Sequence, residues 1–314
     1  MAEMVKKATR ESFGETVTAL AAEYPEIVVL DADLAAATKT GIFKKAYPER
    51  FFDCGIAECN MVGVAAGLAT CGKIPFAASF AMFSAGRAFE QVRNSVGYPK
   101  LNVKIVGSHA GISVGEDGAT HQCCEDIALM RTIPGMVILN PCDHYEMQAA
   151  VRAAVEHKGP CYIRLGRLAV ESINNNDDYK FELGKGITLR EGTDITVVAT
   201  GLMVQEAVKA ADALKEEGIS VEVINIHTIK PLDEELVIAS AKKTGRVITV
   251  EEHNIIGGLG EAVSTALSEH CPTPVTRIGV NDVYGHSGPA VDLLKEFGLS
   301  AEHIEEVIRE KLAK

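Results

Sequence analysis

The run GEDGATHQ, residues 115–122, holds the densest group of side chains able to do chemistry. Asp117 and His121 lie four residues apart in it, and His109 precedes them at the end of an expected strand. A carboxylate accepts hydrogen bonds from hydroxyl groups, and an imidazole donates or accepts near neutral pH. The three side chains therefore suit a polyhydroxylated substrate.

Three other interpretations of this run stay open on local evidence. His109, Asp117 and His121 could form an open three-ligand metal site, although no spacing rule favours one. A phosphate loop would need a lysine or the N–H groups of a helix N-terminus, and the carboxylates of Glu116 and Asp117 would repel a phosphate. The third interpretation is a capped turn, in which Asp117 is the N-cap of a helix beginning at GATHQ and Glu116 only shapes the turn.

Glu58 and the pair Phe80 and Phe83 also have two interpretations each. Glu58 precedes a small-residue helix expected over residues 60–72, so it is either a carboxylate stabilised by the helix dipole or a buried acid–base group. The two phenylalanines are three residues apart, a spacing typical of core packing. Their alternative role is a flat wall for a ring-shaped ligand.

The hydrophobic pattern predicts an α/β protein with two domains. Short apolar runs that indicate strands alternate with amphipathic runs that indicate helices, which predicts mainly parallel sheets flanked by helices on both faces. In the first domain, residues 1–170, strands are expected at 26–34, 74–81, 102–109, 136–143 and 160–167, and helices at 1–17, 60–72, 85–98 and 144–159. A polar linker, residues 171–186, separates it from a second domain at 187–314. That domain is expected to have strands at 194–201 and 246–253, a strand and loop at 219–233, and helices at 203–218, 257–270 and 301–314.

Several polar residues directly follow expected strands of the first domain. Ligands of open parallel sheets bind at the carboxyl ends of the strands. Asp31 and Asp33, His109, Asp143 and Arg167 all occupy such positions. We therefore expect the first domain to carry the site, with Asp143 also placed to cap the helix that follows it.

The composition excludes some classes of partner. The formal net charge is −12 and no basic run is present, which argues against nucleic acid or an anionic membrane. The N-terminus lacks the apolar core of a signal peptide, and no apolar run reaches membrane-spanning length. The eight cysteines form no CxxC pair, which indicates reduced thiols and a cytoplasmic protein.

Taken in order, several segments resemble transketolase along nearly the whole chain. The resemblance covers the pyrimidine-binding and C-terminal domains of that family, and GEDG-x-THQ is its most specific motif. The other matching segments are ATRESFGETV (8–17), LDADL (30–34), GIAECNMVGVAAGLA (55–69), FAMFSAGRAFEQVR (80–93), GSHAGISVGEDGATHQ (107–122) and YIRLGR (162–167). Deoxyxylulose-phosphate synthases and the β subunits of 2-oxoacid dehydrogenases share the sheet and a GIAE-like glutamate, but their substrate loops differ.

The motif that binds diphosphate in transketolases is missing. Transketolases hold the diphosphate and Mg²⁺ of thiamine diphosphate with a GDG motif and a downstream asparagine, in an N-terminal domain. This chain has no GDG, since GEDG contains an extra residue, and it is roughly half as long as a one-chain transketolase. It therefore looks like the C-terminal subunit of a split transketolase, whose diphosphate half, with its Mg²⁺ or Ca²⁺, is a separate polypeptide. The resemblance implies an α2β2 heterotetramer and no metal ligand in this chain.

The resemblance also implies roles for residues at the cofactor. Glu58 matches the glutamate that hydrogen-bonds the aminopyrimidine ring and drives its imino tautomer, and burial in a mostly apolar pocket would favour the protonated carboxyl group. Phe80 and Phe83 match the aromatic wall around that ring, and Ile56 lines it too. Asp33 matches an aspartate beside the cofactor pocket.

Substrate roles follow from the same resemblance. His109, Asp117 and His121 match the substrate channel, with Asp117 facing the ketose 2-hydroxyl and His121 near the reacting carbonyl. Arg10 and Arg167 match a phosphate clamp at the channel mouth.

Two departures from the family pattern leave open whether the substrate is an unphosphorylated or a branched sugar. Ala37 stands where the family often has a phosphate-binding serine, and the SAG segment after Phe83 differs in length. The implied function is ketol transfer from a ketose to an aldose by a two-subunit enzyme. A deoxyxylulose-phosphate synthase and a non-catalytic regulatory subunit are the alternatives.

Overall fold

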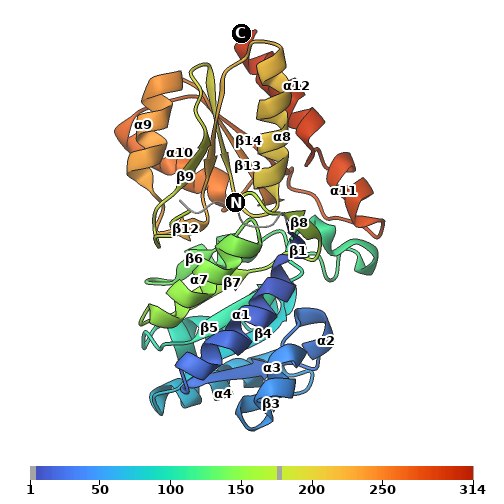
Figure 1. The fold of residues 1–314 in the computed structure, drawn as a ribbon, viewed down its shortest axis with the longest axis vertical. Helices are drawn as coiled ribbons and strands as arrows, with labels where there is room; N and C mark the ends of the chain where they lie inside the picture. Colours follow the sequence, from blue (N-terminus) through green and yellow to red (C-terminus); the bar gives the residue numbers. More distant parts are fainter. Residues whose placement is uncertain (1–4, 175–178, 314) are drawn as a thin grey trace.

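Two large, mainly parallel β-sheets, flanked by helices, lie one above the other in the chain (Figure 1). The computed structural model describes residues 5–174 and 179–313. The α/β class with helices on both faces of the sheets is confirmed. Of the expected linker, residues 175–178 lie outside the described residues, as do residues 1–4 of the expected N-terminal helix.

The first sheet has seven strands in the order β12-β6-β7-β5-β4-β2-β3. Its strands are β2 (Ile27–Asp31), β3 (Phe51–Asp53), β4 (Ile74–Phe80), β5 (Lys104–Ser108), β6 (Val137–Leu139), β7 (Cys161–Arg164) and β12 (Thr228–Lys230). All neighbours pair in parallel except β12 with β6. The associated helices are α1 (Thr9–Glu23), α2 (Ala35–Thr38), α3 (Gly41–Ala46), α4 (Glu58–Thr70), α5 (Phe89–Gln91), α6 (Asp126–Arg131) and α7 (His144–Glu156).

Both faces of this sheet are covered, because alternate residues of its strands pack into two different cores. Ile27 and Val29 of β2 face α1 and α7, in one cluster with Phe13 and Val151. Val28 and Leu30 point to the other face, into a second cluster that includes residues of α4 and α6. Strands that are buried on both sides are continuously apolar, which is why these segments were recognisable in the sequence.

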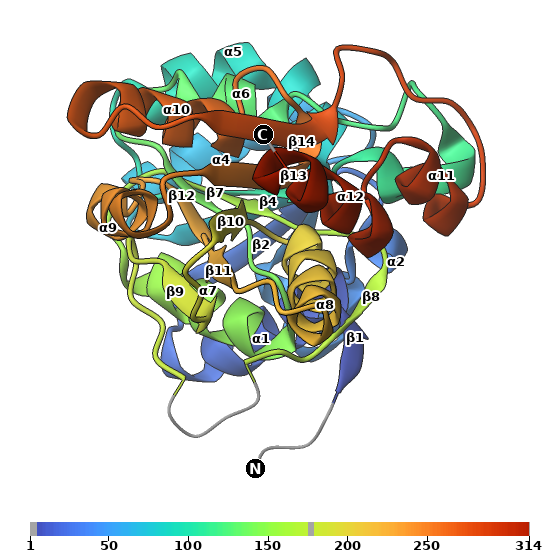
Figure 2. The same cartoon turned by 90° about the horizontal axis from the view of Figure 1, so that it is seen from above.

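The second sheet has the order β14-β13-β10-β11-β9, with β9 antiparallel at its edge. Its strands are β9 (Ile187–Arg190), β10 (Ile195–Ala199), β11 (Val221–Asn225), β13 (Val247–Asn254) and β14 (Val275–Val280). Its helices are α8 (Met203–Glu216), α9 (Glu234–Thr244), α10 (Leu259–His270), α11 (Ala290–Glu296) and α12 (Ala301–Leu312). Helices α8 and α12 cover one face and α9 and α10 the other, as the view from above shows (Figure 2).

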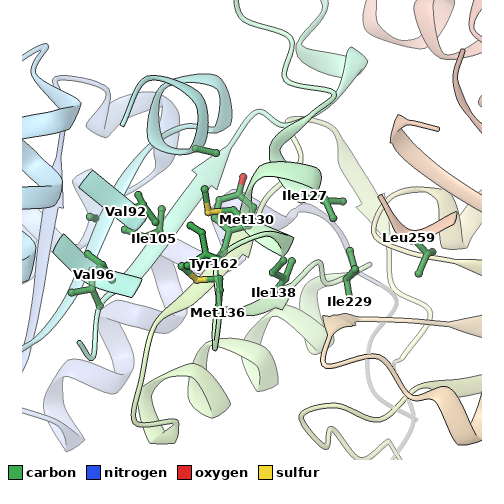
Figure 3. Packing of buried hydrophobic residues seen from close by; sticks show 14 of the residues in the cluster. Val92, Val96, Ile105, Ile127, Met130, Met136, Ile138, Tyr162, Ile229 and Leu259 are labelled. Carbon is green, nitrogen blue, oxygen red and sulfur yellow. The ribbon is translucent and has the colours of Figure 1, made fainter. Parts of the chain in front are cut away.

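The two halves share one continuous hydrophobic core. Ile105 and Tyr162 of the first sheet belong to the same buried cluster as Ile229 and Leu259 from the second half of the chain (Figure 3). Strand β12 belongs by sequence to the second half, yet it extends the first sheet by pairing with β6. A separately packed pair of domains would not need this contact, so each sheet depends on the other for part of its burial.

Three expected elements differ from the structure. The N-terminal helix begins only at Thr9, because Lys6–Ala8 form strand β1, which pairs with β8 (Ala169–Glu171). The helix expected at 85–98 begins at Met82, and it is π-helical over Met82–Arg87 and Val92–Gly97. The expected helix after Asp117 does not form, since that residue ends a 3-10 segment, Ile112–Asp117, and is followed by turns.

Candidate functional site

The carboxyl ends of β2, β3, β4, β5 and β7 meet at one edge of the first sheet, and the candidate site residues follow them. Asp33 comes after β2, and Glu58 follows β3 at the first position of α4. Phe80 ends β4, His109 follows β5, and Arg167 follows β7. This is the edge at which ligands of open parallel sheets bind.

Glu58 is buried and paired with a cation that the sequence did not indicate. Its carboxylate is 2% exposed, and Oε2 accepts a hydrogen bond of 2.8 Å from Nη1 of Arg87. The pocket that the resemblance describes as mostly apolar therefore also contains a guanidinium group at hydrogen-bond distance from the carboxylate. The second oxygen, Oε1, accepts no hydrogen bond from the described residues.

An aromatic cluster connects this ion pair to both candidate histidines. The rings of Phe80 and Phe83 are nearly parallel, with centroids 6.1 Å apart. The guanidinium of Arg87 lies over Phe83 at 4.5 Å. His121 meets the edge of Phe83 at 5.3 Å, and His109 stacks on Phe80 at 4.1 Å. The residues expected at the cofactor wall and at the substrate channel are thus brought together, although they come from four separate segments.

His109 is held as a neutral imidazole. Burial, followed by the positive charges of Arg10 and Arg167, lowers the pKa of His109 to about 3. Its Nδ1 lies 2.9 Å from the Ser108 hydroxyl, and its backbone has a φ of +55°. A positive φ is unfavourable outside glycine, and such strain concentrates at functional sites. His109 can therefore exchange hydrogen bonds with a ligand but does not act as a cation near neutral pH.

Arg10 and Arg167 lie close to each other, as a two-arginine anion site requires. Burial and the charge of Arg167 lower the pKa of Arg10, and the Nε of Arg10 is buried without a partner in the described residues. Arg167 donates to the Val114 carbonyl at 2.6 Å and to the Glu116 carboxylate at 2.7 Å. Glu116 was expected only to shape a turn, and the structure instead makes it the counter-ion of Arg167.

The remaining candidates are exposed at the same edge. The carboxylates of Asp33 and Asp117 are exposed, and neither makes a hydrogen bond within residues 5–174 and 179–313. Ile56 is 77% exposed. Asp143 is not at this site: its carboxylate caps α7 by accepting from the Glu146 amide at 2.8 Å, as expected for a helix cap. The described ranges hold no group of three or more His, Cys, Asp or Glu side chains able to hold a metal ion, so the three-ligand site considered above does not form.

The segment 109–122 is hydrogen-bonded to the second half of the chain. The amide of Ser113 donates to Oε1 of Glu252 at 2.7 Å, and Glu252 belongs to β13. Nε2 of Gln122 donates to the Ile112 carbonyl and, at 3.0 Å, to the His286 carbonyl. Burial raises the pKa of Glu252.

Comparison with known proteins agrees with this arrangement. The family model of the transketolase pyrimidine-binding domain matches residues 5–172, and that of the transketolase C-terminal domain matches residues 184–304. The chain belongs to the transketolase family. The match includes the edge described above, and a pyrimidine-binding domain of transketolase implies the use of thiamine diphosphate. No helix in the described parts of the chain has the length and apolar character needed to cross a bilayer, and the eight cysteines are free thiols.

Similar proteins in this family include subunits of split transketolases. The chain is 52% identical to a Methanocaldococcus jannaschii protein named for the C-terminal section of transketolase, over 99% of this chain and 98% of that protein. It is 47% identical to the 6-deoxy-6-sulfo-D-fructose transketolase subunit of Clostridium sp. (strain MSTE9), over 94% and 91%. A solved structure described as a split gene transketolase, inactive β4 tetramer, has a TM-score of 0.91 and 51% identity, covering 98% of this chain and 99% of that one. Human transketolase is 39% identical, and the chain covers 50% of its length.

The residues present fit the pyrimidine end of the cofactor. An aminopyrimidine needs a carboxyl group that shares a proton with its ring nitrogen, and an aromatic face for stacking. Glu58 offers an oxygen that no described residue occupies, and Phe80 and Phe83 lie beside its ion-pair partner, Arg87. Sequence reasoning missed Arg87, although a signal was present: on a helix it follows Phe83 by four residues, which places both side chains on one face.

Proposed function

We propose that the chain is the C-terminal subunit of a two-chain transketolase. With a separate subunit that binds diphosphate and Mg²⁺ or Ca²⁺, it would transfer a two-carbon ketol unit from a ketose to an aldose. The observation that carries the proposal is the convergence of Glu58, Phe80, Phe83, His109 and His121 at one edge of the first sheet. Thiamine diphosphate supplies the carbanion chemistry when it is bound.

Each residue of the candidate site has a proposed role. Glu58 would hydrogen-bond the pyrimidine ring through Oε1, and the two phenylalanines would contact its face. Neutral His109, together with His121, would exchange hydrogen bonds with sugar oxygens. Exposed Asp117 would accept from the ketose 2-hydroxyl.

We assign Arg10 and Arg167 to an anionic group at the far end of the sugar. Two guanidinium groups close enough to lower the pKa of one of them repel each other, and an anion between them would relieve that repulsion. A phosphate or a sulfonate would serve, and the relative named above acts on a sulfonated sugar. The charge of Glu116 on Arg167 weakens the attraction, so neutral sugars stay among the expected substrates.

The diphosphate-binding partner is a proposal that rests on three observations. The chain covers half of human transketolase. Ile56 and Asp33, which the resemblance assigns to the cofactor pocket, are exposed in this chain and would be covered by the partner. The similar solved structure of a split transketolase is described as inactive, as expected of a subunit without its partner. We expect an α2β2 heterotetramer in the cytoplasm, with no contact to nucleic acid or membrane.

The decisive experiment measures ketol transfer by the purified chain alone and by the chain mixed with its partner. Thiamine diphosphate and Mg²⁺ are supplied, and donors and acceptors are tested with and without phosphate groups. Turnover by the isolated chain would refute the split-subunit proposal. Turnover only with pyruvate as donor would favour the synthase alternative, and a complex that binds cofactor but transfers nothing would favour a regulatory subunit.

Two substitutions test the residue roles. Glu58→Gln should abolish transfer by the complex while the fold is retained. Its matched control is Glu222→Gln, since Glu222 is also a buried carboxylate, 1% exposed and paired with a partly exposed lysine, Lys243, away from this edge. Asp117→Ala should raise the KM of the donor more than that of the cofactor, and unchanged donor kinetics would remove the role given to Asp117.

A further inference from the structure

The backbone of the segment 109–122 is held only in part by hydrogen bonds within the segment. His109, Gly111, Gly115 and Gly118 all have positive φ angles, between 55° and 85°. The segment forms only a short 3-10 stretch, Ile112–Asp117, interrupted at Gly115. A chain with this many left-handed residues and little regular hydrogen bonding has other conformations of similar energy. Its observed path therefore also depends on contacts from outside, among them the hydrogen bond that Arg167 of the first half donates to the Val114 carbonyl.

The second half of the chain supplies those contacts at both ends of the 3-10 stretch. At its beginning, Oε1 of Glu252 accepts the Ser113 amide at 2.7 Å. Gly111 packs directly against the same carboxylate, in a space that a Cβ atom at this position could not share. Beyond its end, Gln122 donates to the His286 carbonyl at 3.0 Å.

Glu252 is itself held rigidly. Its side chain is 3% exposed, and its carbonyl oxygen accepts from Nη2 of Arg164 at 2.8 Å. Arg164 in turn pairs with buried Asp126 at 2.8 Å and 3.2 Å, and Tyr162 donates to the same carboxylate. This network crosses from β7 of the first sheet to β13 of the second, so it fixes the backbone that carries Glu252 relative to the candidate site.

We propose that Glu252 is a positioning residue, through which the C-terminal domain sets the place of the substrate-binding segment. The segment carries His109, Asp117 and His121, so the proposal rests on the function proposed above for these side chains. It gives the second domain a part in substrate recognition without contact with the substrate. The task requires an oxygen that accepts the Ser113 amide, which a carboxylate or a carboxamide of the same size can supply.

The test compares two variants of nearly equal side-chain size. Glu252→Gln keeps an oxygen that can accept the Ser113 amide, whereas Glu252→Met removes the acceptor and preserves the volume. Glu251 gives the matched control, because it is the adjacent buried glutamate, 1% exposed, and its carboxylate caps α10 by accepting from Leu259 and Gly260. Glu251→Met should disturb α10 and leave the segment 109–122 as it is.

Hydrogen exchange of the full chain without its partner is the first measurement. Loss of its buried acceptor leaves the Ser113 amide unsatisfied, so the amides of residues 111–117 should exchange roughly 10- to 100-fold faster in Glu252→Met. Glu252→Gln and Glu251→Met should exchange there as the wild type does, and β10 should be unchanged in all three. Equal exchange in Glu252→Met and wild type, or the same acceleration in Glu251→Met, would overturn the proposal.

Steady-state kinetics of the complex is the second measurement. Glu252→Met should raise the KM of the sugar donor about 10-fold or more with a smaller change in kcat and no change in the affinity for thiamine diphosphate, and Glu252→Gln should restore the wild-type KM. Equal effects on donor and cofactor would indicate a merely structural role and overturn the proposal.

If the complex has no transferase activity with any variant, the proposed function fails while the exchange measurement still decides the role of Glu252. Should Glu252→Met not fold, Gln122→Met removes the hydrogen bond to the His286 carbonyl together with the one to the Ile112 carbonyl, and it should accelerate exchange at residues 118–122. Unchanged exchange there would overturn the proposal that the C-terminal domain sets the place of this segment.

Discussion

Replacement of Arg87 tests whether the buried carboxylate of Glu58 depends on its ion pair. Arg87→Met keeps most of the side chain that packs over Phe83 and removes the charge. Breaking a fully buried ion pair costs about 3–5 kcal/mol, and a hydrogen bond to a charged group contributes about 1.5–3 kcal/mol. Glu58 is 2% exposed but Arg87 is 48% exposed, so water already weakens the pair. We expect a loss of about 2 kcal/mol in the free energy of unfolding.

The pair is measured by a double-mutant cycle with Arg87→Met and Glu58→Gln, using thermal unfolding of the chain. Each single substitution should lower the free energy of unfolding. The double variant should lose about 1–2 kcal/mol less than the two single losses added together, because it no longer contains an unpaired buried charge. For a chain of this length the loss in Arg87→Met corresponds to about 3 °C in Tm. The matched control is Lys243→Met, which also deprives a buried glutamate, Glu222, of its cation.

Measuring transferase activity distinguishes the Glu58–Arg87 pair from the Glu222–Lys243 pair. Arg87→Met should lower kcat/KM of the complex about 10-fold or more, because Glu58 loses the contact that orients it, and small misplacements of a reacting group are costly. Lys243→Met should lose similar stability and keep its activity. Additive effects in the cycle, or equal activity losses in Arg87→Met and Lys243→Met, would refute this reasoning.

Three further predictions concern buried ionisable groups. Burial and the charge of Asp143 raise the pKa of Glu146 from 4.5 to about 7, so its stabilising contribution is present below pH 4.5 and is lost as the pH rises through about 7. The free energy of unfolding of Glu146→Gln relative to wild type should therefore rise by about 1–3 kcal/mol between pH 5 and 8, and a difference independent of pH would contradict the assignment. His109 should stay neutral in an NMR titration from pH 8 to 5, since its pKa is about 3; a midpoint near 6.5 would show that it is hydrated. Asp126→Leu leaves Arg164 buried without its partner and should cost about 3–5 kcal/mol by chemical denaturation, while a loss below 1 kcal/mol would mean that water or another carboxylate replaces Asp126.

The sequence by itself determined the α/β class and most of the first sheet. Strands such as Ile27–Asp31 and Ile74–Phe80 are buried on both faces, so their runs of apolar residues are visible without any knowledge of their neighbours. The cap of α7 by Asp143 was equally local, because its hydrogen bond spans only three residues. Short elements such as β3 and α2 carry too few residues for a periodic signal, and they were not predicted.

For the site, the residue types and motifs indicated Glu58, the phenylalanine pair, the histidines and the arginines, and the family resemblance gave each a role. The tertiary structure decided their partners. Arg87 reaches Glu58 across 29 residues of sequence, and Arg167 reaches Glu116 across 51. Neither pair has a local pattern, because the contact depends on which strands are neighbours in the sheet.

The second half of the chain shows most clearly that contacts between distant residues are not visible in the sequence. Its sequence predicted strands and helices but did not indicate that any of its residues contribute to the candidate site. Only the packed structure places Glu252 against Ser113, 139 residues away, and adds β12 to the edge of the first sheet. Local periodicity determines which segments become strands or helices, whereas contacts between distant segments depend on how two sheets bury a common core. The run GEDGATHQ could therefore be singled out from the sequence, but the second half of the chain that holds it in place could not.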